Sequence, residues 1–344
     1  MKRFSRFSAI ASCALLFTAI LALVSCEYKD LCYNHPHLVN VRVQFDWSLA
    51  PDAQPDGMTV LFYDMDNPSA YPVRFDFRGR EGGTVQVNAG TYRVLSFNYD
   101  TKSILFRGIE TIGTYEGYTR QSTLSEGTQM SGSLPVDGTK NESVILSGDM
   151  LWAATSKPLT VEQRASVDYN DVQEGSGVTD QIDYTVVLRP EQRIRIITVT
   201  ARNKSDLVWS NRYSGAISTL TSSVFLETGK QGMDEVTQAF PLTMINDSTL
   251  QTDFYVFGHC PDGNVEAADT HRLTIYGVQE DGKKWYSILD VTAQMHDPVK
   301  NPDPFHIYVT VDSLPVPKYI PGEHESGMEG SIDSWQPVDI PIGM

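Results

Sequence analysis

Apolar and polar side chains alternate in short segments along most of this chain, and this two-residue period constrains the fold more than any other feature. Residues 38–47 show the pattern clearly. One face of that segment carries Val39, Val41, Val43, Phe45 and Trp47, and the other carries Asn40, Arg42, Gln44 and Asp46. Successive side chains of a β-strand point to opposite faces, so the pattern predicts a strand with one buried face.

The same period returns in further short segments. In the N-terminal half it covers residues 58–63, 73–77, 84–87 and 92–97, and in the C-terminal half residues 184–188, 194–200, 223–226, 252–257, 272–276, 284–289 and 306–311. Clusters rich in Pro, Gly, Asp and Asn separate the first of these segments, and no amphipathic helical run lies between them. Strands at this spacing predict an all-β fold made of antiparallel β-sandwiches.

A polar stretch divides the strand-forming segments into two groups. It covers residues 162–181 and has no sustained period of either kind. Domain boundaries fall in exposed linkers of this composition. We therefore predict two tandem sandwich domains, one over residues 37–165 and one over residues 182–344.

The N-terminus has the order of a signal peptide. Basic residues precede the apolar residues 9–24, a stretch shorter than the ~20 residues that span a bilayer. The stretch ends in Leu-Val-Ser-Cys at Cys26, which resembles the lipobox of bacterial lipoproteins. The resemblance implies that residues 1–25 are removed, that lipid on Cys26 holds the protein to a membrane, and that residues 26–36 form a tether. A plain secretion signal beside a chance cysteine is the alternative.

The charge balance argues against nucleic acid as a partner. The chain has 27 Lys and Arg against 43 Asp and Glu, a formal net charge of −16, and the predicted leader removes only basic residues. A protein that binds phosphates by counterion release must present a basic surface, and no basic patch with interleaved aromatic residues follows the leader. The acidity favours solubility and indicates no particular ligand.

The cysteines do not form a disulfide framework. Cys13 leaves with the predicted leader and Cys26 carries the lipid, so Cys32 and Cys260 remain. In an oxidising compartment these two thiols could form one bridge, or both could stay unpaired.

The sequence contains no catalytic signature, and we predict that the protein is not an enzyme. It lacks Gly-x-Ser-x-Gly, Ser-x-x-Lys, Cys-x-x-Cys, His-Glu-x-x-His and a glycine-rich phosphate loop. A glycosidase needs only two carboxylates at the right separation, and the sequence selects no such pair. Trp47, Tyr63, Phe75 and Phe77 fall at strand spacing, so we interpret them as core residues rather than as a platform for sugars.

Four groups of residues resemble metal ligands, yet we predict neither a metal nor another cofactor. The first two groups are Cys32 with His35 and His37, and His259 and Cys260 with His271; the other two are Asp64, Asp66 and Asn67, and Asp168, Asn170 and Asp171. A zinc site normally needs a further ligand, and neither acidic group continues into a calcium-binding loop. We interpret the first group as extended tether, the second as packing at a strand end, and the acidic groups as solvated turns.

Several blocks of the chain resemble the fimbrillin-like lipoproteins of Bacteroidota. The lipobox is followed by a strand that ends in Phe-Asp-Trp at Trp47. Further blocks begin at Asp149 (Asp-Met-Leu-Trp-Ala), Phe254 (Phe-Tyr-Val-Phe-Gly-His), Asp290 (Asp-Val-Thr-Ala-Gln), His306 (His-Ile-Tyr-Val-Thr-Val-Asp) and Trp335 (Trp-Gln-Pro-Val-Asp-Ile-Pro-Ile), and resemble an uncharacterised family of that group. The resemblance implies two transthyretin-like sandwiches and a non-enzymatic role in fimbrial assembly, anchoring or adhesion at the outer membrane.

Two more inferences rest on the same resemblance. The acidic segment that begins at Glu27 is similar to the export signal of surface lipoproteins, which implies exposure on the cell surface. Stalk fimbrillins are cut by an arginine-directed protease in or after the first strand. Here the nearby arginine is Arg42, in mid-strand, where its backbone would be held in a ladder. This position favours an anchor, a tip or a non-polymerising relative over a stalk subunit.

The C-terminus predicts an edge strand that could be exchanged between subunits. Val338, Ile340 and Ile342 alternate with Pro337, Asp339 and Pro341. The prolines lack amide hydrogens, so this strand belongs at a sheet edge. We predict that it completes the second sandwich and could contact a neighbouring subunit. A carbohydrate-binding surface lipoprotein of a glycan-uptake system is the alternative function, since both functions suit a sandwich on a lipid tether.

Overall fold

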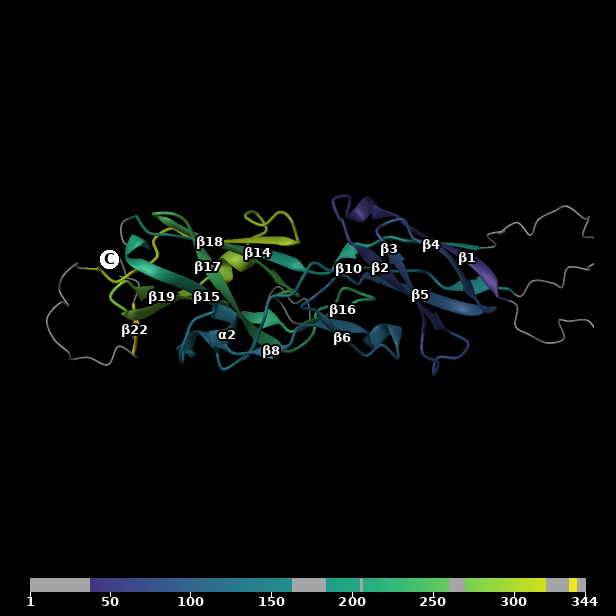
Figure 1. Ribbon diagram of the computed structural model, residues 1–344, viewed down its shortest axis with the longest axis horizontal. Helices are drawn as coiled ribbons and strands as arrows, with labels where there is room; N and C mark the ends of the chain where they lie inside the picture. Colours follow the sequence, from purple (N-terminus) through teal and green to yellow (C-terminus); the bar gives the residue numbers. More distant parts are fainter. Residues whose placement is uncertain (1–37, 163–183, 205–206, 260–269, 320–333, 339–344) are drawn as a thin grey trace, which may run out of the picture.

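β-Strands are the main secondary structure, as Figure 1 shows for a computed structural model that describes residues 38–162, 184–204, 207–259, 270–319 and 334–338. Two sandwiches follow one another along the long axis, with a small sheet between them. Within these described residues the helical elements are short: α2 (Leu124–Thr128), α3 (Thr292–Met295), and the 3-10 turns η1 (Trp47–Leu49), η2 (Ile112–Thr114), η3 (Asp137–Thr139) and η5 (Leu207–Trp209). The predicted all-β sandwich fold is confirmed.

The first sandwich packs a three-stranded sheet against a larger one. The smaller sheet has the order β12 (Tyr184–Leu188), β1 (Val39–Phe45), β4 (Gly83–Val87). The larger has the order β13 (Glu191–Gln192), β10 (Trp152–Thr155), β5 (Gly90–Asn98), β2 (Gly57–Asp64), β3 (Val73–Arg78), with β11 (Leu159–Val161) also beside β5. Val39, Val41 and Val43 meet Val60, Phe62 and Val94 in the core between them. The alternation predicted for β1 is therefore present.

Strand β2 departs from the predicted alternation, because residues 57–63 are buried on both faces. Its outer face is covered by a third layer, a small sheet in the order β16 (Ser223–Phe225), β7 (Glu116–Tyr118), β6 (Leu105–Arg107). Leu61 and Tyr63 of β2 pack there with Ile112 and Tyr115, and with Leu226 from the second half of the chain. This shared core joins the two sandwiches.

The second sandwich is built on one long strand that belongs to both of its sheets. Its strands follow the order β21 (His306–Val311), β14 (Arg195–Arg202), β18 (Thr249–Val256), β17 (Glu235–Asn246), β15 (Ser210–Thr221), β19 (Arg272–Gln279), β20 (Lys284–Asp290), β22 (Trp335–Pro337). Strand β17 pairs with β15 through its first part and with β18 through its last residues. Phe240 of β17 stacks on Phe254 of β18, with ring centroids 4.2 Å apart, in a core that also contains Trp285.

The packing units do not follow chain order. Strand β9 (Ser143–Ile145), with β8 (Gln121–Ser122) beside it, pairs with β17 of the second sandwich, whereas β12 pairs with β1 of the first. The predicted boundary lies largely in residues 163–183, outside the described residues. Strands from each side of it therefore cross to the other sandwich.

Not every strand pair is antiparallel. Among the described strands, four pairs are parallel: β1 with β12, β14 with β21, β17 with β9, and β20 with β22. Parallel neighbours need a crossover rather than a hairpin, and the long returns along the chain supply it. In the part of the chain that the structure describes, no helix is long and apolar enough to cross a membrane.

Candidate functional site

The C-terminal strand β22 forms the outer edge of the second sandwich. It runs parallel to β20, with Trp335 opposite Lys284 and Pro337 opposite Tyr286. Just after it, the Val338 amide donates to the Tyr286 carbonyl at 2.8 Å. Pro337 has no amide hydrogen to offer, a feature compatible with an edge position. Few backbone hydrogen bonds thus hold this strand, and its other side has no partner strand among the described residues.

Two side chains fix β22 to the sandwich. The Trp335 indole nitrogen donates to the Ser133 carbonyl at 2.8 Å, and its ring meets Tyr276 edge to face, with centroids 5.5 Å apart. Val338 is half-buried and packs against the main core. Of the three residues predicted to form the exchangeable face, Val338 is placed against this core, while Ile340 and Ile342 lie outside the described residues. Cys26 also lies outside them.

The first strand is held in a different way. Strand β1 is the central strand of its sheet, paired with β12 on one side and with β4 on the other. Arg42 stands in the middle of it, opposite Thr185 on one side and Thr84 on the other. Its side chain is exposed, but its backbone lies inside two ladders. A protease that binds its substrate in an extended conformation would first have to separate three strands.

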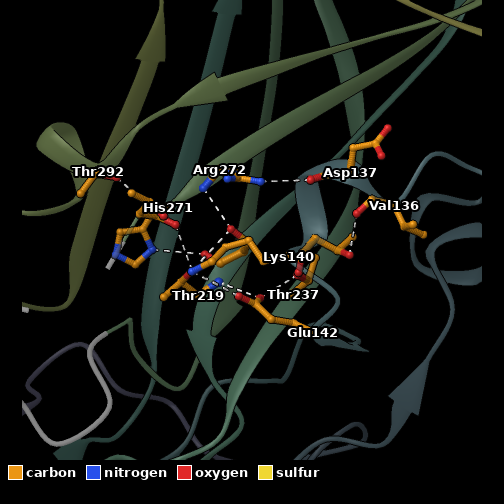
Figure 2. Close-up of polar contacts among 12 residues, drawn as sticks. Val136, Asp137, Lys140, Glu142, Thr219, Thr237, His271, Arg272 and Thr292 are labelled. Carbon is orange, nitrogen blue, oxygen red and sulfur yellow. Dashed lines mark hydrogen bonds and ion pairs between the residues drawn. The ribbon is translucent and has the colours of Figure 1, made fainter. Parts of the chain in front are cut away.

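A buried polar network joins the connecting segment before β9 to the second sandwich (Figure 2). The Glu142 carboxylate accepts from the Thr219 amide at 2.9 Å and from the Thr237 hydroxyl at 2.8 Å. Lys140 donates to the Thr219 hydroxyl at 2.8 Å. Thr219 has φ of 63°, in a bulge of β15 between Ile217 and Leu220. A backbone conformation that L residues seldom adopt is thus held by side chains from another part of the chain.

Next to this network, two of the predicted candidate ligands come together. His259 follows β18 and His271 precedes β19, and their ring centroids are 5.4 Å apart. Burial, with a smaller contribution from the charge of Arg195, lowers the pKa of His259 to about 3, so its imidazole is neutral at neutral pH. Their neighbour Cys260 lies outside the described residues. A third imidazole, His296, also lies there, 5.0 Å from His259 between centroids.

The sequence offered no signal for His296, because it follows His271 by 25 positions in a segment without a period. The remaining candidate metal ligands either form a turn, as predicted, or lie outside the described residues. The Asp64 carboxylate accepts from the amides of Asp66 and Asn67, and Asp66 accepts from the Thr91 amide. These oxygens serve the backbone of a turn. The groups at Cys32 and at Asp168 lie outside the described residues.

The fold places this chain among proteins built of two β-sandwiches. This chain belongs to the family described as a domain of unknown function, DUF5119, whose model matches residues 25–241. The "Putative fimbrium anchoring subunit Fim4B" of Bacteroides ovatus is 25% identical over 239 residues, which cover 69% of this chain. The match spans 66% of that relative's own length, just under two thirds.

A solved structure shares the fold. A structure from Bacteroides ovatus, described as "a putative adhesin", aligns with a TM-score of 0.55 and 19% identity, and the alignment covers 83% of this chain and 98% of that one. The "fimbrial anchor protein Mfa2" of Porphyromonas gingivalis aligns over 80% of this chain and 90% of its own, with a TM-score of 0.44 and 14% identity. The suspected similarity to fimbrial surface proteins of this bacterial group is confirmed.

Proposed function

We propose that this chain is a non-enzymatic surface lipoprotein of fimbrillin type that anchors fimbrial subunits to the outer membrane or mediates adhesion there. The observation that carries the proposal is its similarity, over 69% of its length, to a relative named as a fimbrium anchoring subunit. The similarity to this relative is one of sequence, and the relative's name supplies the functional idea. The sequence adds no catalytic signature that would favour an enzyme.

The arrangement of strand β1 supports an anchor rather than a stalk subunit. A stalk subunit of the kind considered above would lose its first strand and accept one from a neighbour. In this chain β1 is central, and five residue pairs join it to each neighbour. Removal of β1 would separate β12 from β4 and expose the valine-rich side of the core. The first sandwich is therefore suited to remain closed at the membrane end.

The opposite end of the molecule offers the contact for a subunit. Strand β22 is an edge strand with few ladder bonds, and edges of this kind add strands from other chains readily. We propose that Val338, Ile340 and Ile342 form the apolar side of a segment that contacts the next subunit. We propose that lipid on Cys26 makes the membrane contact and that the sandwiches lie outside the cell.

The glycan-binding alternative gains no support from the groove between the small sheet and the second sandwich. Tyr118 is the aromatic residue of its lining, beside Arg107, Gln121 and Asp234. The Arg107 guanidinium lies 4.7 Å from the centre of the Tyr118 ring and covers one of its faces. A sugar-binding platform needs an open aromatic face, so this groove does not provide one on that side.

The lipid and the anchoring role are tested together in a strain that lacks the gene. The wild-type gene should restore fimbriae that stay on the cells, and its product should take up labelled fatty acid and be cut by protease added to intact cells. The variant Cys26→Ser should lose the label and release fimbriae into the medium. Cys32→Ser is the matched control and should behave as wild type. Retention of label and of cell-bound fimbriae by Cys26→Ser would refute the proposed anchor.

A further inference from the structure

Three histidines from separate elements meet at one end of the second sandwich. His259 follows β18, His271 precedes β19, and His296 is the C-cap directly after α3. One ring nitrogen of each lies within 4.8 Å of the others. His259 and His271 are buried, with 7% and 0% of their surfaces exposed, and His296 is half-buried. Three backbone segments converge here and bring the three imidazoles together.

The spacing of the rings suits three ligands of one metal ion. Zinc binds imidazole nitrogen at about 2.0 to 2.1 Å, so two ligand nitrogens in a tetrahedral site are about 3.3 Å apart and their ring centroids about 5.2 Å apart. In this protein the Nε2 atoms of His271 and His296 are 3.1 Å apart. The three centroid distances are 5.0, 5.1 and 5.4 Å.

The surroundings of His271 prepare its Nε2 atom for a metal. Its Nδ1 atom lies 3.2 Å from the Ser218 carbonyl, which can only accept, so Nδ1 carries the proton and Nε2 presents a lone pair (Figure 2). Metal-binding histidines characteristically donate the N–H of their second ring nitrogen to a carboxylate, a backbone carbonyl or water. The His271 amide is also fixed, because it donates to the Thr292 hydroxyl at 2.8 Å.

The ring nitrogens of His296 have fewer hydrogen-bond partners among the described residues than those of His271. Its Nε2 faces the Nε2 of His271, and a contact between two imidazole nitrogens needs a proton or a metal ion between them. Its Nδ1 is buried with no hydrogen-bond partner among the described residues. Buried polar atoms are nearly always partnered, and an ion is one of the standard reasons for an exception.

We propose that His259, His271 and His296 bind one divalent transition-metal ion of the zinc class. Neutral imidazoles suit zinc, copper and nickel, whereas calcium and magnesium require oxygen ligands. Three ligands leave a fourth position for water or for another donor. The ion would tie the end of β18, the start of β19 and the end of α3 together, beside the bulge that Glu142 supports. Its expected effect is to stabilise the fold, and the fimbrial role does not depend on it.

The test uses the full chain, purified without a histidine tag and freed of metal by a chelator. Titration with Co²⁺ should give one bound ion per chain, with the visible absorption of a low-symmetry nitrogen site. One equivalent of Zn²⁺ should displace the cobalt and raise the melting temperature by several degrees. His296→Gln should weaken zinc binding at least tenfold while the circular dichroism of the metal-free protein stays unchanged.

Two control variants separate this site from other histidines. His306→Gln removes an imidazole of the same sandwich that lies outside the cluster, and His35→Ala with His37→Ala removes the pair in the predicted tether. Both should bind zinc as the wild type does. The proposal fails if the wild-type chain binds no Co²⁺ or Zn²⁺ at micromolar concentration, or if only the tether variant loses binding. A wild-type chain that binds neither ion refutes the proposal by itself, so that outcome does not depend on how well any variant folds.

Discussion

Glu142 is a buried carboxylate that accepts a hydrogen bond from the backbone amide of Thr219. Its side chain is 7% exposed and lies 3.7 Å from the Lys140 ammonium. A left-handed residue such as Thr219 is strained by about 1 to 3 kcal/mol, and its amide cannot reach the regular ladder at the bulge. The Glu142 carboxylate supplies the missing acceptor. A buried polar group that lacks a hydrogen-bond partner lowers the stability of the fold.

We therefore expect Glu142→Gln to lower the free energy of unfolding by about 1 to 3 kcal/mol, the cost of leaving a buried charged or polar group without its partner. The amide can replace one carboxylate oxygen but must turn its NH₂ group toward either Lys140 or the donors on the other side. Denaturation in urea, read by fluorescence, measures the change. The matched control is Glu81→Gln, because Glu81 is exposed. Equal stability of the two variants would contradict the role given to Glu142.

At the scale of elements, we predict that strand β22 stabilises the second sandwich and can be exchanged for a peptide of the same sequence. Truncation after Ser334 removes Trp335 and Val338 from their partly buried positions, and we expect it to cost about 1 to 3 kcal/mol of unfolding free energy. The edge of β20 is then open. A synthetic peptide with the sequence of residues 334–344 should bind the truncated chain and restore its stability.

The control for this experiment is Gln336→Ala, whose native side chain is exposed. It should leave stability unchanged and should not create a peptide-binding site. If the truncated chain matches the wild type in stability and captures no peptide, the segment is a tail and the strand-exchange proposal is wrong.

Many of the strands could be predicted from the sequence, but the two longest, β15 and β17, are not among the predicted segments. Most of β15 is buried on both faces, so it carries no two-residue period. Several strand neighbours could not be predicted either. A period of two marks a strand with one solvated face, and β1 follows it because one of its faces meets solvent. The burial of both faces of β2 depends on a third layer from residues 105–118 and 223–226, which no local pattern specifies. Long-range topology also sets the pairing of β9 with β17 and the contact of His296 with His271. The periodicity of a sequence is a local signal and does not predict such contacts.

At the level of the whole molecule, the shared core between the sandwiches predicts cooperative unfolding. Leu226 of the second half is fully buried beside Leu61 and Tyr115 of the first half. An ion pair of Arg93 with Glu227, at 2.6 Å, lies at the same junction. Separate domains of this size would unfold independently if their interface were small and wet. We expect a single calorimetric transition for this chain.

Leu226→Ala should test the coupling directly. Removal of a buried leucine side chain costs about 2 to 5 kcal/mol, and here the loss falls on the junction. The transition should therefore broaden or split into two in differential scanning calorimetry. Leu49→Ala is the matched control, because Leu49 is 55% exposed. Two transitions already present in the wild-type protein would show that the junction does not couple the sandwiches.

The central position of β1 also has a mechanical consequence. Strands β1 and β22 lie toward opposite ends of the long axis (Figure 1). In the proposed arrangement a pull on a fimbrium enters near β22 and leaves through the tether ahead of β1. The tension on β1 then runs along the strand and loads the rungs shared with β12 and β4 together, in shear, rather than opening them one at a time. The end fixed to the membrane would thus resist traction, while the lightly held β22 would yield first.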